Sequence, residues 1–148
     1  MITMDSNGEV ILKSVAAKLT DLDIDKMTRM QAISLMAAMK RRIHIDGLDS
    51  SGKPIGIYSP GYLKYTRPKH NRKEGSKVVL SLTRSMESAM NIYPIKGGTG
   101  IGYTTAEQLQ KSKWNEKTYK KRIFAPTEGE VNLAKEIANN FIAEHFNG

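Results

Sequence analysis

Polar and apolar residues alternate with helical spacing through residues 131–145, where one face recurs at three- and four-residue steps. This face consists of Val131, Ala134, Ile137, Ala138, Phe141, Ile142 and His145. Just before it, Thr127 and Glu130 have the spacing of a capping box, in which each side chain accepts the other residue's backbone N–H. The pattern predicts an amphipathic helix that begins near Thr127 and buries one stripe.

A second helical pattern covers residues 23–43 and is apolar on two sides. Asp21 or Asp23 is placed to cap this helix. One stripe consists of Ile24, Ala32, Leu35, Met36, Met39 and Ile43, and the other side carries Met27, Met30, Ile33 and Ala37. Flexible methionine side chains suit packing against a second surface. We therefore expect Met27, Met30 and Ile33 to contact either a neighbouring subunit or a second layer of the core.

The remaining patterns predict shorter elements separated by turn residues. Residues 9–19 have the spacing of a helix, and the few residues before them can pair as an edge strand. Strands are expected at 55–58, 77–82, 90–95 and 101–104, with turns at 46–54 and 97–100, a helical turn within 81–89, and a helix at 105–118 capped by Thr105. Residues 59–76 are polar, basic and interrupted by proline and glycine, so we predict a long basic loop that a partner orders.

The length and composition indicate a single domain over residues 1–148 with a modest core, since only 39% of the residues are hydrophobic. Cysteine is absent, which excludes disulfides and thiolate metal sites and fits a reducing compartment. The sequence contains no run of about 18 apolar residues and no recognisable export signal. We therefore expect a protein without membrane contact.

Positive charge is unevenly distributed along this chain of net charge +8. One block consists of Lys64, Arg67, Lys69, Arg72, Lys73 and Lys77; another, of Lys111, Lys113, Lys117, Lys120, Lys121 and Arg122, surrounds Trp114 and Tyr119. Such blocks are commonly solvated faces or contacts for acidic proteins. Lysines interleaved with aromatic rings can also follow a phosphate backbone while the rings stack on bases. The candidate nucleic-acid contacts are Lys113, Trp114, Tyr119, Lys120, Lys121 and Arg122.

The glycine-rich segments do not fit nucleotide-binding motifs. Gly47 to Lys53 matches the first seven positions of the phosphate-loop pattern, but Pro54 stands where the motif needs a serine or threonine. The segment also follows a helix and leads into an expected strand, the reverse of a phosphate loop. Near residue 100 the glycine spacing misses the dinucleotide fingerprint, because Tyr103 occupies its last position. A hairpin turn accounts better for this second segment.

Catalytic and metal-binding patterns are equally weak. His44, His70 and His145 are far apart in the sequence and form no H-x-x-x-H pair. The serines lack the G-x-S-x-G elbow, and the acidic residues are scattered at polar positions. We therefore expect a protein that is not an enzyme and that has no cofactor and no metal site.

The order of several short motifs resembles the virion morphogenesis and tail-completion proteins of tailed bacteriophages. These motifs are Lys40-Arg41-Arg42-Ile43 at the end of the central helix, Asp46-Gly47 to Gly52-Lys53-Pro54-Ile55, Ser59 to Tyr62, Val79 to Ser88, and the segment from Tyr119 to Glu130. The similarity covers residues 30–146. It departs from the family pattern at Arg84, which stands where a glycine follows the threonine of the family's Leu-x-x-Thr-Gly element.

The resemblance implies an α+β subunit in which a small twisted antiparallel sheet packs with a long central helix and a C-terminal helix, beside a long basic loop or hairpin. It also implies a homo-oligomeric ring at the neck or tail end of a virion, assembled in the host cytoplasm. Such a head-tail connector or tail-completion subunit contacts adjacent portal, neck or tail proteins. On this interpretation Arg67, Lys69, Arg72 and Lys73 contact those proteins, and contact with packaged DNA is a weaker alternative. The main competing interpretation is a free-standing basic nucleic-acid-binding protein.

Overall fold

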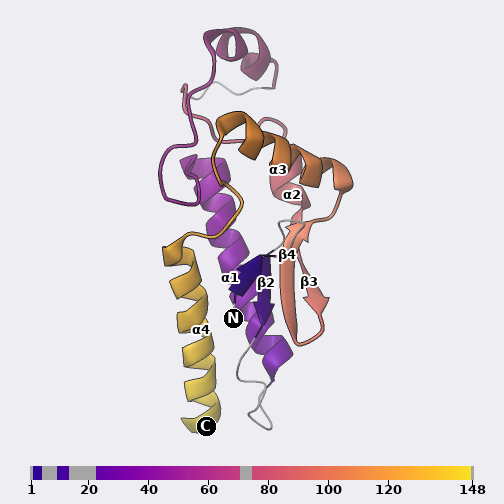
Figure 1. The fold of residues 1–148 in the computed structure, drawn as a ribbon, viewed down its shortest axis with the longest axis vertical. Helices are drawn as coiled ribbons and strands as arrows, with labels where there is room; N and C mark the ends of the chain where they lie inside the picture. Colours follow the sequence, from indigo (N-terminus) through magenta and orange to yellow (C-terminus); the bar gives the residue numbers. More distant parts are fainter. Residues whose placement is uncertain (1, 5–9, 14–22, 71–74, 148) are drawn as a thin grey trace. The chain divides into compact units, whose positions relative to one another are not determined.

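The computed structural model describes residues 2–4, 10–13, 23–70 and 75–147, and its architecture is α+β (Figure 1). The chain forms two compact units, each built from separate stretches of sequence. Unit 1 comprises residues 1–39, 90–102 and 125–148, and unit 2 comprises residues 40–89 and 103–124. The expectation of one domain over residues 1–148 stays a prediction.

Unit 1 contains a four-stranded sheet in the order β1 (Ile2–Met4), β2 (Val10–Lys13), β4 (Gly98–Tyr103) and β3 (Met90–Ile95). β2 pairs antiparallel with both β1 and β4. A two-residue turn at residues 96 and 97 joins β3 to β4, with Gly97 in the left-handed region at φ +76°. The predicted antiparallel sheet is therefore confirmed.

Two sequence predictions in this sheet are wrong. We expected a helix from residue 9, but Val10–Lys13 is a strand. A run of β-branched and apolar residues suits a sheet better than a helix. The rest of that expected helix, residues 14–19, lies outside the described residues. Gly98 to Gly100 belong to β4 and are not a turn. At Gly100 a Cβ atom would lie 2.4 Å from the ring of Tyr93, so the ring occupies the space that a side chain would need.

Helix α1 (Ile24–Arg41) contacts both the sheet and the C-terminal helix α4 (Glu128–Asn147) within unit 1. Asp23 caps α1, since its carboxylate accepts the backbone N–H of Lys26 at 2.9 Å. The hydroxyls of Thr28 and Thr99 are 3.0 Å apart, and the Gln31 side chain donates to the carbonyl of Ala134 at 2.7 Å. The buried core of this unit includes Met27, Ala32, Leu35, Met39, Met90, Ile101 and Ala134.

The start of α4 has the predicted capping box. Glu130 N–H donates to the Thr127 hydroxyl at 3.1 Å, and Thr127 N–H donates to the Glu130 carboxylate at 2.8 Å. Both bonds satisfy donors that a helix start leaves open. Only part of the predicted stripe is fully covered: Ala134 is completely buried, Phe141 and Ile142 are half-buried, and His145 is exposed.

We expect Thr127→Ala to lower the free energy of unfolding by about 1 kcal/mol, because Glu130 N–H loses its acceptor. Thr127→Ser keeps the hydroxyl and should lose less. Chemical denaturation followed by circular dichroism measures both variants. Equal losses in the two would show that the threonine methyl group, and not the cap, carries the effect.

Unit 2 is mainly helical. Its elements are the turns η2 (Arg42–Asp46), η3 (Tyr62–Thr66) and η4 (Arg67–His70) and the helices α2 (Ser85–Ala89) and α3 (Ala106–Tyr119). Thr105 caps α3 as predicted, accepting the N–H of Gln108 at 3.2 Å. The buried side chains of this unit include Ile43, Ile55, Val78, Met86, Ile123 and Phe124.

Three further predictions fail in unit 2. The segment expected to be an extended loop is helical from Tyr62 to His70, while residues 71–74 lie outside the described residues. The expected strands at 55–58 and 77–82 are reduced to a single bridge between Ile57 and Lys77. Leu80 has φ +42°, a conformation that ends an extended strand.

Candidate interaction surfaces

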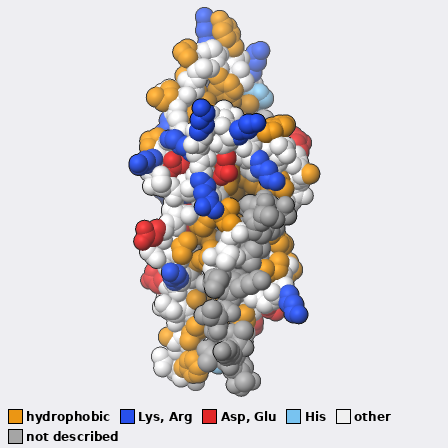
Figure 2. All heavy atoms as spheres, viewed as in Figure 1, with side chains coloured by type: hydrophobic (Ala, Val, Ile, Leu, Met, Phe, Trp, Pro, Cys, Tyr) orange, Lys and Arg blue, Asp and Glu red, His pale blue; other side chains and the backbone are white. Residues whose placement is uncertain are grey.

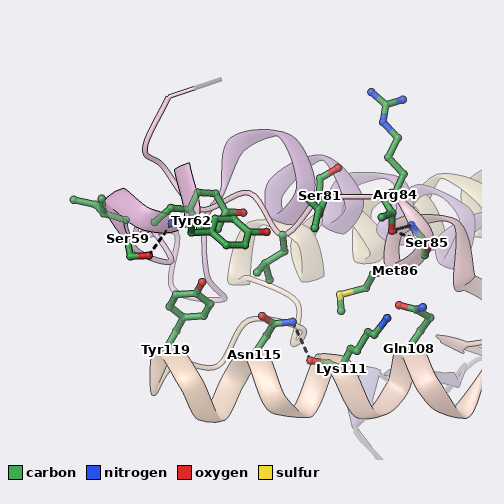
Figure 3. A pocket seen from close by; sticks show the side chains of 15 residues that line it. Ser59, Tyr62, Ser81, Arg84, Ser85, Met86, Gln108, Lys111, Asn115 and Tyr119 are labelled. Atoms are coloured by element: carbon green, nitrogen blue, oxygen red, sulfur yellow. Dashed lines mark hydrogen bonds between the residues drawn. The ribbon is translucent and has the colours of Figure 1, made fainter. Parts of the chain in front are cut away.

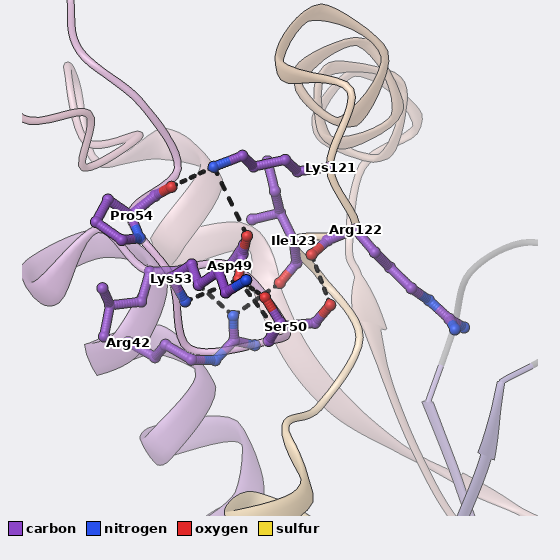
Figure 4. A network of polar contacts seen from close by, with 10 residues as sticks. Arg42, Asp49, Ser50, Lys53, Pro54, Lys121, Arg122 and Ile123 are labelled. Atoms are coloured by element: carbon purple, nitrogen blue, oxygen red, sulfur yellow. Dashed lines mark hydrogen bonds and ion pairs between the residues drawn. The ribbon is translucent and has the colours of Figure 1, made fainter.

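The turn at residues 46–54 is held by a polar network around the buried carboxylate of Asp49 (Figure 4). One carboxylate oxygen accepts three hydrogen bonds, from the N–H of Ser51, the hydroxyl of Ser51 and the N–H of Lys53. The ammonium of Lys121 lies 3.9 Å from the other oxygen and donates to the carbonyl of Pro54. Burial alone would raise the pKa of Asp49, but these hydrogen bonds and Lys121 together hold it below its usual value.

The same network fastens residues 122–124 to the turn. The buried guanidinium of Arg42 donates to the carbonyls of Leu48 and Ile123, at 3.0 and 2.9 Å. The carbonyl of Arg122 accepts from both the N–H and the hydroxyl of Ser50, while the Arg122 side chain points away from the network in Figure 4. These contacts fix the backbone that follows α3. Sequence reasoning missed the network because nothing in the run of three basic residues at 40–42 marks Arg42 as the buried one.

A buried histidine lies on η2. His44 is 4% exposed, and its Nδ1 lies 3.1 Å from the carbonyl of Leu80. Because a carbonyl only accepts, Nδ1 carries the proton, and the buried Nε2 has no hydrogen-bond partner among the described residues. Burial lowers the pKa of His44, against smaller raising contributions from the Leu80 hydrogen bond and from Glu87.

We expect the stability of unit 2 to fall as the pH drops below about 6.5, the ordinary pKa of histidine. Just below pH 6.5 the histidine of the unfolded chain binds a proton, while His44 of the folded chain stays neutral because its pKa is lowered. The free energy of unfolding is therefore highest above pH 6.5 and falls as the pH drops toward the folded pKa of His44. His44→Gln keeps a donor for Leu80 and removes the titration. Denaturation series from pH 5 to pH 8 should therefore show a shallower slope for this variant; an unchanged slope would assign the pH dependence to other groups.

The exposed side of α3 carries lysines and the single tryptophan. Lys113, Trp114 and Lys117 are exposed there, and Lys120 follows directly as the left-handed residue that ends the helix. Trp114 keeps 58% of its surface accessible. The opposite side is buried at Gln108 and Ser112. We call Lys113, Trp114, Lys117 and Lys120 the α3 surface.

Only some of the predicted nucleic-acid contacts share this surface. Lys113, Trp114 and Lys120 belong to it, and Arg122 is exposed nearby in the sequence. Lys121 instead serves the Asp49 network. Tyr119 is half-buried, because its ring approaches Gly56 and lines a groove.

Positive charge is concentrated in unit 2. Its ranges contain 17 Lys and Arg against 6 Asp and Glu residues, a formal net charge of +11, whereas unit 1 has 6 against 9, a net charge of −3. Figure 2 shows Lys and Arg side chains more widely spread than Asp and Glu side chains over the upper part of the visible face. Unit 2 therefore carries the excess of positive charge in this chain, and we call its exposed Lys and Arg side chains the cationic face of unit 2.

A groove of about 620 Å³ lies within unit 2 (Figure 3). Lys111, Asn115 and Tyr119 of α3 point into it from one side, and Tyr62 and Met86 line it from other segments, while Arg84 points away. The rings of Tyr58 and Tyr62 are 4.8 Å apart at its end. No sequence pattern indicates this groove, because its residues come from three separate stretches, 57–62, 80–86 and 108–119.

The residues of the basic loop that we expected to contact virion proteins differ in their exposure to solvent. Arg67 is buried, 1% exposed, with its guanidinium 4.6 Å from the centre of the Tyr58 ring, so its predicted role as a partner contact is wrong. Lys69 is exposed and available. Arg72 and Lys73 lie outside the described residues.

The three residues of α1 that we predicted as contacts also differ in their exposure to solvent. Met27 is 1% exposed and belongs to the core, which was one of the two roles expected of it. Met30 and Ile33 are 43% and 46% exposed. These two side chains leave an apolar flank of α1 uncovered by the described residues.

Within the described part of the chain, no group of three or more histidine, aspartate or glutamate side chains could hold a metal ion. None of the helices in the described part of the chain combines the length and the hydrophobicity that a membrane span requires. No protein-family model, no curated protein and no solved structure matches this chain.

Proposed function

We propose that this protein is a structural subunit of a tailed-phage virion, a neck or tail-completion protein that forms a ring through contacts between its copies. The observation that carries the proposal is the exposed flank of α1. Met30 and Ile33 leave nearly half of their surface in water, on a helix whose other stripe is buried at Ala32, Leu35 and Met39. Apolar side chains left on a regular helix suit a subunit contact.

The ring follows from the kind of contact that such a subunit makes. A contact between different surfaces of identical copies closes into a ring when the rotation allows it. One surface available for such a contact is the apolar flank of α1 in unit 1. The neighbouring portal, neck or tail proteins are the further partners that we propose.

The arrangement of the resemblance motifs supports the proposal as well. Two of these motifs, residues 46–55 and the start of the segment 119–130, are bound to each other through Asp49, Arg42 and Lys121. These two segments are distant in the sequence, yet they form a single structural element. Their order along the chain is what resembles the family.

The proposal is tested by light scattering of the full chain over a range of concentrations, with electron microscopy of any assembly. We expect a concentration-dependent multimer with a central channel. Met30→Gln combined with Ile33→Gln should reduce it to monomer, because both side chains leave the contact. Leu133→Gln, at a residue 37% exposed on α4, is the matched control and should assemble normally. A wild-type chain that stays monomeric at every concentration would contradict the ring.

A further inference from the structure

We propose that the α3 surface binds single-stranded nucleic acid, with its lysines on the phosphates and Trp114 stacked on a base. This inference is independent of the ring and of the flank of α1. It assigns a ligand to one side of one helix, which composition alone does not do.

The geometry of α3 places these groups together. Lys113 and Lys117 are four residues apart and so lie one above the other, about 6 Å apart along the helix axis. Trp114 lies beside them, and Lys120 extends the same cationic group beyond the helix end. The result is a short row of ammonium groups with an indole ring beside it.

The acidic residues of α3 do not neutralise this row. Glu107 pairs with Lys111 at 2.6 Å, and the carboxylate of Glu116 accepts the N–H groups of Ile123 and Phe124 at 2.8 and 3.0 Å. Lys113, Lys117 and Lys120 form no ion pair within the described residues. Their charges are therefore available to a polyanion, which binds by releasing its condensed counterions.

The tryptophan decides between nucleic acid and an acidic protein. An acidic surface would pair with the lysines but would leave the 58% exposed ring of Trp114 without a suitable partner. A single strand supplies phosphates for the lysines and a base for Trp114, because every base has a π-face that can stack on an aromatic ring next to the phosphate contacts. Duplex DNA pairs its bases and would engage only the lysines.

The single tryptophan makes the test direct, because tryptophan fluorescence, excited at a wavelength that tyrosine does not absorb, then reports on Trp114 alone. We expect a thymidine oligomer of about 20 nucleotides to quench the fluorescence of the full chain and to bind less tightly as salt rises. Lys113→Gln, Lys117→Gln and Lys120→Gln together should weaken binding at least about tenfold and lower the salt slope by about 2, since each phosphate contact contributes about 0.7.

The control variant carries Lys26→Gln, Lys96→Gln and Lys135→Gln. It removes the same charge from exposed lysines of unit 1 and should bind as the wild type does. Equal weakening in both triple variants would overturn the proposal in favour of general charge attraction. Poly-glutamate that bound as tightly as the oligomer, with Trp114 fluorescence unchanged by either, would overturn it in favour of an acidic protein. The multimer mass of the α3 variant, measured alongside, should equal that of the wild type.

Discussion

Replacing Gly47 with alanine is expected to cost about 3 kcal/mol or more of the free energy of unfolding of unit 2. Gly47 ends η2 at φ +65°, in the left-handed region that a Cβ atom disfavours by roughly 1–2 kcal/mol. The added Cβ would also lie 2.3 Å from the carbonyl oxygen of Val78. That oxygen belongs to the backbone of a buried residue, so it cannot move aside as a flexible side chain can.

A second glycine in the same turn separates the two causes. Gly52 also has a left-handed φ, +79°, but a Cβ there would meet nothing within 4 Å. Gly52→Ala should therefore lose only about 1 kcal/mol, the conformational part. Denaturant unfolding followed by Trp114 fluorescence measures both variants in unit 2. Equal losses would mean that the approach of Val78 contributes nothing.

We expect Arg42→Met to destabilise unit 2 by about 2–4 kcal/mol. The methionine can fill much of the buried volume but cannot donate to the carbonyls of Leu48 and Ile123. Both carbonyls then lose their charged donor, and the backbone after α3 loses an attachment to the turn. The loss should also increase the exchange of the amide hydrogens of residues 123 and 124.

Arg41 provides the matched control, because it has the same chemistry one residue earlier. Its side chain is 76% exposed and lies 3.8 Å from Asp46, so this ion pair is worth at most about 1 kcal/mol. Arg41→Met should therefore unfold nearly as the wild type does. A large loss at Arg41, or none at Arg42, would refute the assignment of the network to Arg42.

The long helices could be predicted because their signals are local. The capping box at Thr127 and the caps at Asp23 and Thr105 all form as the sequence indicates. Each cap depends on residues three apart, and each apolar stripe repeats over several turns. The α+β class was instead implied by the family resemblance, and the observed helices and strands confirm it.

The failures come from interactions between distant residues. The side chain of Arg67, read as a loop cation, is buried against Tyr58. Leu80 leaves the strand conformation, and its carbonyl lies 3.1 Å from Nδ1 of His44, a residue 36 positions away. The α3 surface was found only in part, since the sequence cannot tell that Lys121 turns toward Asp49 while Lys113 does not. Burial of a charged residue is set by tertiary neighbours, which periodicity does not encode.

The construction of each unit from separate stretches has a consequence for synthesis on the ribosome. The hydrogen bond of Arg42 needs the carbonyl of Ile123, which is synthesised 81 residues later. The hydrogen bond of Gln31 needs the carbonyl of Ala134, which is synthesised 103 residues later. Neither unit can close until those later residues have left the ribosome, so we expect folding to be slowed by long-range contacts. Nascent chains stalled before residue 120 should then be cleaved readily by protease, because neither unit has yet formed these contacts.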